Sequence, residues 1–143
     1  GAQNVFCPAP ENFVGYYANS EREVQALINF TNNINPALTI SYHTRGQIIY
    51  YGFETLTPAE LERDRLIVNQ LSNVTGYPPV LTQNSTGGYS DWVSDNLRAT
   101  AFTIEVGAVT LPHPIGEEYL AEIFERNREV PAVALAVVGG QTS

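Results

Sequence analysis

The sequence predicts an α/β sandwich, in which helices pack against a sheet of a few strands. Three short apolar segments, at residues 37–43, 47–51 and 101–106, have the composition and spacing of strands. Segments in which apolar residues recur at helical spacing alternate with them along the chain. Three strands are too few to close a barrel, and the sequence contains no internal repeat.

Two helices begin at capping boxes, in which a Ser or Thr side chain and a Glu three residues later satisfy free backbone N–H groups. The first box, residues 20–23 (SERE), opens a helix that Pro36 ends. The second box, residues 57–60 (TPAE), has Pro at the first helical position and opens a helix that stops at Gly76.

The remaining segments are an arm, a connection and two further helices. Residues 1–19 form an N-terminal arm without periodicity, and residues 77–88 form a connection rich in Pro, Thr and Gly. Helices are expected at residues 89–97 and 116–130. Pro131 kinks the second of these before a stretch that is apolar on all sides, which we expect to be buried.

Length and charge restrict the classes of function. The 143 residues are enough for one core, so we expect a single domain over residues 1–143. Fifteen acidic residues against seven basic ones, all of them Arg, give a net charge of −8, which disfavours nucleic acid as a partner. We expect no membrane span and no signal peptide, and the single cysteine, Cys7, excludes an intramolecular disulfide.

Two polar residues end or interrupt apolar strands. His43 follows the apolar residues of the first strand, and Glu105 lies inside residues 101–106. In open α/β sheets the functional crevice lies at the carboxyl ends of the strands. A His and a Glu there can act as metal ligand and general base, the pairing used in zinc-assisted hydrolysis of an amide. The structural alternative is a hydrogen-bonded core His and an exposed Glu at the edge of the sheet.

Three segments resemble motifs of the zinc carboxypeptidases, in the same order. Residues 40–51 (ISYHTRGQIIYY) resemble the strand and turn that deliver the third zinc ligand. Residues 87–92 (GGYSDW) resemble the substrate-pocket segment, and residues 102–107 (FTIEVG) the strand that bears the catalytic glutamate. The resemblance covers residues 8–138 and implies the fold of this family, a phosphorylase/hydrolase-type mixed sheet flanked by helices, here truncated at its N-terminal side.

Two further stretches are similar to the bacterial branch of the family that cleaves γ-D-glutamyl-diamino acid bonds in peptidoglycan peptides. They are residues 8–15 (PAPENFVG), together with residues 20–23, and residues 111–115 (LPHPI). The branch implies a bacterial origin and a peptide or cell-wall peptide as partner. It leaves the compartment, cytoplasm or cell envelope, open.

The resemblance implies roles for individual residues. His43 would be a zinc ligand, and Glu105 would activate the zinc-bound water and stabilise the transition state. Asp91 would supply the counter-charge for the amino group of a diamino acid, whereas simple packing is the alternative for Tyr89 and Trp92. The residues that would contact the substrate are Thr44, Arg45, Tyr89 and Asp91.

The sequence also departs from the family pattern. Family members hold zinc with an additional His-x-x-Glu pair and bind the substrate carboxylate with Asn-Arg and another Arg, and this chain contains none of these. Arg45 stands where the bacterial branch has Gln and can bind a substrate carboxylate. His113, which prolines flank, is expected to be a turn residue. A catalytic zinc needs about three protein ligands, so we expect zinc to be weakly bound or absent.

Two functions are compatible with these residues. As an enzyme, the chain would be half of a zinc peptidase, completed by a chain that bears His-x-x-Glu. As a pseudoenzyme it would bind a peptide or form a homo-oligomer through the edge and the apolar patch that a partial sheet exposes. We favour the second function for the chain alone, and a shared fold with an unrelated function is a third alternative.

Overall fold

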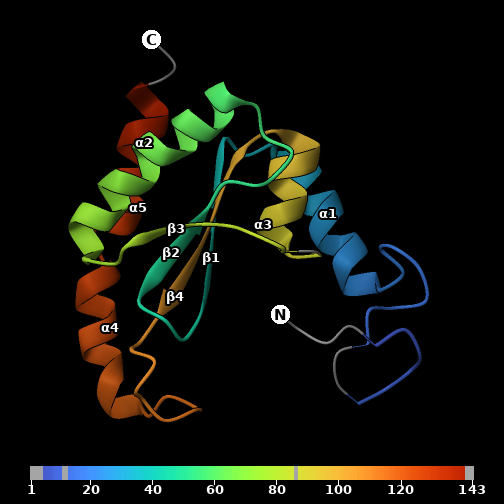
Figure 1. Cartoon of the computed structure of the whole chain (residues 1–143), viewed down its shortest axis with the longest axis horizontal. Helices are drawn as coiled ribbons and strands as arrows, with labels where there is room; N and C mark the ends of the chain where they lie inside the picture. The colour runs from blue at the N-terminus through green and yellow to red at the C-terminus, as the bar shows by residue number, and fades with distance from the viewer. Residues whose placement is uncertain (1–4, 11–12, 86, 141–143) are drawn as a thin grey trace. The chain divides into compact units, whose positions relative to one another are not determined.

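A four-stranded mixed sheet forms the centre of residues 37–143 in the computed structural model, which describes residues 5–10, 13–85 and 87–140 (Figure 1). Neighbouring strands are parallel for β1 and β4, antiparallel for β2 and β4, and parallel for β2 and β3. The predicted α/β class and the three predicted strands are confirmed. The strands, in their order across the sheet, are β1 (Leu38–Thr44), β4 (Thr100–Val106), β2 (Ile48–Tyr51) and β3 (Pro79–Leu81).

The third strand along the chain, β3, lies in the segment that the sequence indicates as a loop. It is only three residues long and begins with a proline. Its pairing partner is β2, whose Ile49 N–H donates to the Pro78 carbonyl at 3.0 Å. The strand therefore forms because β2 offers backbone partners, and not because of an apolar pattern of its own.

The described residues form five α-helices. The predicted helix at residues 89–97 forms as α3 followed by one π-helical segment, Val93–Leu97, and the predicted helix after residue 116 begins with a 3-10 turn, Glu117–Tyr119. None of the described helices is long and apolar enough to cross a membrane. The α-helices are α1 (Arg22–Ile34), α2 (Pro58–Thr75), α3 (Tyr89–Trp92), α4 (Leu120–Asn127) and α5 (Val130–Gly140).

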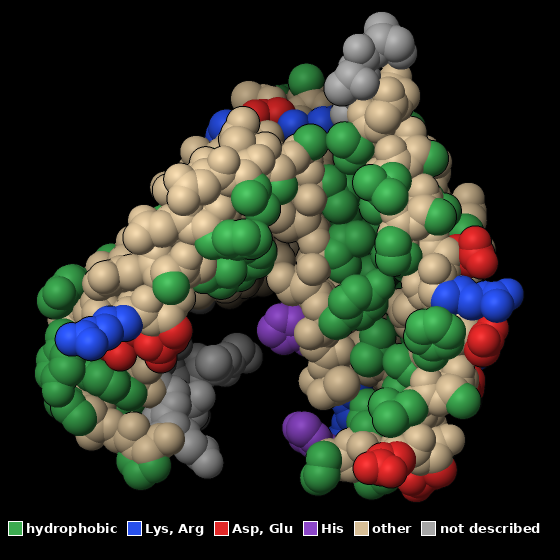
Figure 2. Space-filling model, turned by 180° about the vertical axis from the view of Figure 1, so that it is seen from behind, with side chains coloured by type: hydrophobic (Ala, Val, Ile, Leu, Met, Phe, Trp, Pro, Cys, Tyr) green, Lys and Arg blue, Asp and Glu red, His purple; other side chains and the backbone are tan. Residues whose placement is uncertain are grey.

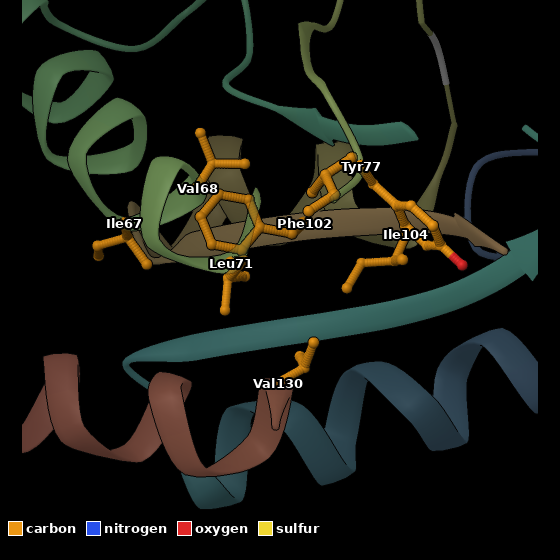
Figure 3. Close-up of a cluster of buried hydrophobic side chains, with 8 residues drawn as sticks. Ile67, Val68, Leu71, Tyr77, Phe102, Ile104 and Val130 are labelled. Atoms are coloured by element: carbon orange, nitrogen blue, oxygen red, sulfur yellow. The ribbon is translucent and has the colours of Figure 1, made fainter. Parts of the chain in front are cut away.

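The side chains of β4 alternate between the two faces of the sheet, because successive residues of a strand point to opposite sides. Phe102 and Ile104 are fully buried on the face covered by α2 and α5 (Figures 1 and 3). Thr103 and Glu105 therefore point to the other face. The core on the first face consists of Ile49, Ile67, Val68, Leu71, Tyr77, Phe102, Ile104 and Val130.

The capping box at the start of α2 forms as predicted. The Glu60 backbone N–H donates to the Thr57 hydroxyl at 3.3 Å, and the Thr57 N–H donates to the Glu60 carboxylate at 2.7 Å. Arg98 donates to the same carboxylate, with its Nε 2.9 Å from Oε1. The helix ends where Gly76 adopts a left-handed conformation at φ 71°. Hydrogen bonds from Arg98 and Thr57 lower the pKa of Glu60 to about 2.

This lowered pKa makes part of the stability depend on pH. Because the folded pKa lies below the unfolded value of about 4.5, the contribution of Glu60 is complete above pH 4.5 and is lost as the pH falls towards 2. We expect Glu60→Gln to destabilise the chain at pH 7, with a loss that shrinks on acidification. Urea unfolding at pH 7 and at pH 3 measures the loss of stability in Glu60→Gln. Glu54→Gln is the control for an exposed carboxylate. A loss of equal size at pH 7 and pH 3 would contradict it.

The start of α1 differs from the prediction. The helix forms and ends before Pro36, but its N-cap is Glu21 and no side chain caps it. The Ser20 hydroxyl instead accepts from the Tyr16 N–H at 3.1 Å and donates to the Glu21 carboxylate at 2.8 Å. The capping box at residues 20–23 is therefore wrong, because the arm competes for the same hydroxyl.

The predicted burial of the C-terminal apolar stretch is also wrong for most of its surface. Only Val130 and Ala134 of α5 are buried, whereas the Leu135 side chain is 75 % exposed. The helix packs one side against α2, and nothing among the described residues covers the opposite side. The helix breaks after Asn127, ahead of the predicted kink at Pro131, and Pro131 lies in the first turn of α5.

By its contacts the chain divides into two compact units, Gly1–Pro36 and Ala37–Ser143. The first contains α1 and the described part of the arm, in which Val5 and Phe13 form an isolated bridge. Residues 1–4 and 11–12 of the predicted arm lie outside the described residues. The single domain over residues 1–143 stays a prediction.

Candidate active site

His43 and Glu105 lie side by side at the carboxyl ends of two neighbouring strands. They are register partners in the parallel pair β1 and β4, so both side chains leave the same face of the sheet. His43 is exposed, and Glu105 is half-buried on a strand that has a neighbour on each side. The structural alternative of a core His and an edge Glu therefore does not apply.

The Glu105 carboxylate has an oxygen that the fold leaves without a partner. Its Oε2 is buried and accepts no hydrogen bond from the described residues. A buried polar atom of this kind costs about 1–3 kcal/mol and calls for an explanation in a native protein. A reacting group that binds to Glu105 would provide that partner.

The turn from β1 to β2 passes over Glu105. The Gly46 N–H donates to the Gly107 carbonyl at 2.9 Å, which ties the turn to the end of β4. Thr44 is exposed and Arg45 is half-buried. Arg45 forms no ion pair with the described residues, whereas five of the other six arginines do. Its guanidinium is therefore available to a ligand.

The short helix α3 lies on the same face of the sheet as His43 and Glu105. The Ser90 and Thr103 hydroxyls are 2.9 Å apart, and Thr103 precedes Glu105 by two residues of β4. The predicted substrate residue Tyr89 is half-buried and stacks on Trp92, with 6.5 Å between the ring centroids. The segment that resembles the substrate pocket is thus next to the predicted catalytic pair.

Asp91 has a structural role in this helix. Its Oδ2 accepts hydrogen bonds from the Ser85 hydroxyl at 2.7 Å and from the Gly88 N–H at 3.0 Å. The side chain is buried, with 8 % of the residue exposed. One carboxylate oxygen therefore holds the connection to the start of α3, which the sequence alone does not reveal.

The described residues do not form a complete metal site. They contain no group of three His, Cys, Asp or Glu side chains that could hold a metal ion. A catalytic zinc takes about three protein ligands, and His43 supplies one. His113 is exposed in the loop after β4, and Figure 2 shows both histidine side chains, in purple, on the same side of the molecule.

Sequence reasoning missed the part of β2 that borders the site. Ile48 and Tyr50 are register partners of Glu105 and Thr103 in the antiparallel pair, so they share the face of His43 and Glu105. The pairing joins residues more than 50 positions apart, and no local pattern indicates it. Gly46 directly follows two predicted site residues, Thr44 and Arg45, and a glycine in such a place is a signal of close backbone approach.

Comparisons with known proteins place the chain in a family. The sequence profile of the zinc carboxypeptidases matches residues 3–129. Gamma-D-glutamyl-L-diamino acid endopeptidase 1 of Lysinibacillus sphaericus is 37 % identical over 116 residues, which are 81 % of this chain and 28 % of that protein. An uncharacterized protein of Bacillus subtilis (strain 168) is 26 % identical over 109 residues, 75 % of this chain and again 28 % of the relative.

Solved structures share the fold. Murein-tripeptide amidase from Escherichia coli O157 matches with a TM-score of 0.58 at 21 % identity, over 87 % of this chain and 44 % of the amidase. Thrombin activatable fibrinolysis inhibitor matches with a TM-score of 0.54 at 23 % identity, over 87 % of this chain and 33 % of that one. The chain thus spans less than half the length of each of these proteins. It belongs to the zinc carboxypeptidase family.

Proposed function

We propose that the chain contributes one part of a peptide-hydrolysing site that acts on γ-D-glutamyl-diamino acid bonds of peptidoglycan peptides. The observation that supports this most strongly is the register pair of His43 and Glu105, on one face at the carboxyl ends of parallel strands. The names of the Lysinibacillus endopeptidase and the murein-tripeptide amidase point to the same class of substrate. The catalytic residue would be Glu105, and His43 a zinc ligand.

The proposed role of Glu105 is general-base catalysis. Its free Oε2 accepts a proton from the water that attacks the carbonyl carbon of the scissile amide. The new carbon–oxygen bond forms as that proton leaves, and Glu105 then returns the proton to the nitrogen as the carbon–nitrogen bond breaks. These steps consume one water and yield an amine and a carboxylic acid, and they need no further reactant.

We further propose that these 143 residues alone bind zinc weakly or not at all and do not hydrolyse peptides. The sequence has two histidines, His43 and His113, and each is followed three residues later by a glycine where the family pair has a Glu. Ligands from outside these residues must then complete the site. In that case the chain alone is catalytically inactive, and the assembled site is active.

Complementation tests this proposal. The chain is mixed with a first half of a zinc carboxypeptidase that carries His-x-x-Glu, and release of the diamino acid from a γ-D-glutamyl-diamino acid peptide is followed. The assembled pair should hydrolyse the peptide, and each half alone should not. A correctly assembled pair that retains zinc but has no activity would refute the proposal.

Arg45 is the proposed site for a carboxylate of the substrate, because it is half-buried in the turn after His43 and has no ion-pair partner among the described residues. A γ-glutamyl group carries a free α-carboxylate on the same residue whose side-chain amide is cleaved. Loss of a charged hydrogen bond costs about 1.5–3 kcal/mol, so Arg45→Gln should lower kcat/KM about 10- to 100-fold.

The control for Arg45 is chemical as well as mutational. A substrate whose α-carboxylate is replaced by a carboxamide should react equally well with the wild type and with Arg45→Gln. Arg128→Gln, which changes an exposed arginine at the C-cap of α4, should leave both substrates unaffected. If Arg45→Gln lowered kcat/KM equally for the carboxylate and the carboxamide substrate, Arg45 would not bind this carboxylate.

Three further residues are proposed substrate contacts. Thr44 is exposed beside Arg45, and Tyr89 and Asp91 lie on α3. Asp91 would attract the second amino group of a diamino acid through the oxygen that Ser85 and Gly88 leave free. In the same assay, Asp91→Asn should weaken hydrolysis of the diamino acid substrate more than that of an alanine analogue, and equal effects would refute the contact.

Self-association is a second candidate function, and two observations favour it. β1 is an edge strand of seven residues without a charge or a proline, so it has no device against pairing with another strand. Large apolar side chains are exposed on α4 and α5, with Phe124 65 % and Leu135 75 % exposed. Sedimentation of the chain at high concentration should show a homo-oligomer, and a well-folded monomer would exclude this function.

A further inference from the structure

Gly46 is in closer contact with Glu105 than its place in a turn requires. A Cβ atom built on Gly46 would lie 3.0 Å from the Cβ of Glu105, and 3.2 Å and 3.5 Å from the Cγ1 and Cδ1 of Ile48. Gly46 is not among the residues with positive φ. Glycine is therefore needed here for space and not for an unusual backbone conformation.

The backbone of the turn is fixed at this close distance. The Gly46 N–H donates to the Gly107 carbonyl at 2.9 Å. Gly107 has φ 73°, and a Cβ there would meet Ile115 at 2.5 Å, so the end of β4 is closely packed at this residue as well. The turn thus lies directly against Glu105, which leaves the stem of that side chain little freedom to move.

We propose that Gly46 is a positioning residue that sets the direction of the Glu105 carboxyl group. The proposal rests on the proposed catalytic role of Glu105 and adds a residue to it. Any side chain at position 46 pushes the Glu105 stem by a few tenths of an ångström, because a contact of 3.0 Å is tighter than nearly all Cβ contacts in proteins. The free Oε2 at the far end of the side chain then moves away from the place where the fold holds it.

The first test uses the chain alone and does not depend on activity. The carboxyl carbon of Glu105 is observed by NMR in a chain labelled at glutamate, and Glu105→Gln identifies its signal. Gly46→Ala should move this signal. The matched control is Gly139→Ala in α5, where a Cβ meets nothing within 4 Å, and it should leave the signal in place. An unmoved signal in a folded Gly46→Ala chain would overturn the proposal.

A second pair of variants covers the case in which Gly46→Ala does not fold. Ile48→Ala removes two of the three close contacts and keeps the one with Glu105. The double variant Gly46→Ala/Ile48→Ala is therefore compared with Ile48→Ala alone. A signal that differs between these two chains supports the proposal, and an identical signal contradicts it.

Kinetics of the assembled pair separate positioning from stability. A misplacement of about 1 Å can cost 10²-fold in rate, so Gly46→Ala should lower kcat on the order of 10-fold and displace the pH profile, with KM nearly unchanged. An unchanged kcat in an active pair would overturn the proposal. If the wild-type pair is inactive, the proposed function fails, and the NMR comparison still decides the role of Gly46.

Discussion

Glu105→Gln should abolish nearly all hydrolysis by an assembled pair that contains this chain. Glutamine keeps the shape of the side chain but cannot accept the proton from water, and general-base catalysis contributes about 10²- to 10⁴-fold in rate. We therefore expect kcat to fall by that factor while KM changes little. Steady-state kinetics on a γ-D-glutamyl-diamino acid peptide measure both quantities.

The control is Glu117→Gln, which changes an exposed carboxylate in the 3-10 turn before α4. It should retain wild-type kinetics. Retention of a substantial part of the activity by Glu105→Gln, with zinc bound and the fold intact, would exclude Glu105 as the general base. The unpartnered Oε2 would then need another explanation.

His43→Ala should weaken zinc binding by the assembled pair by at least 10²-fold. Loss of a group that only supports a ligand typically costs 10- to 100-fold in metal affinity, so loss of a ligand itself should cost more. Competition with a zinc-binding dye measures the change. His113→Ala removes the other imidazole of the chain and should leave zinc affinity unaltered. Equal effects of the two variants on zinc affinity would exclude His43 as a specific zinc ligand.

The two site residues could be placed from the sequence because two simple rules act on them. Side chains alternate along a strand, and the crevice of an α/β sheet lies at the carboxyl ends of the strands. His43 and Glu105 each occupy such a position in an apolar segment. The parallel register that makes them neighbours confirms the placement, although their chemical roles stay predictions.

Local chemistry also explains which helix was predicted best. The capping box at Thr57 and Glu60 and the glycine at position 76 set both ends of α2, and all their partners lie within a few residues. The box at residues 20–23 failed because the Ser20 hydroxyl found partners in Tyr16 and Glu21. A motif of four residues cannot show such competition from the preceding loop.

Contacts between distant segments were beyond the sequence. β2 pairs with β4 and not with the preceding strand, and β3 forms only as the partner of β2. The same is true of the hydrogen bonds that Asp91 accepts from Ser85 and Gly88. The exposure of Leu135 depends on what covers α5, and the apolar sequence of that helix indicates only that a cover is favourable.

Elemental analysis of the purified chain tests the central claim most directly. The claim is that His43 and Glu105 form part of a zinc peptidase site that the described residues do not complete. The chain alone should contain far less than one zinc per molecule, and the assembled pair close to one. Near-stoichiometric zinc in the chain alone, lost in His43→Ala, would contradict the account.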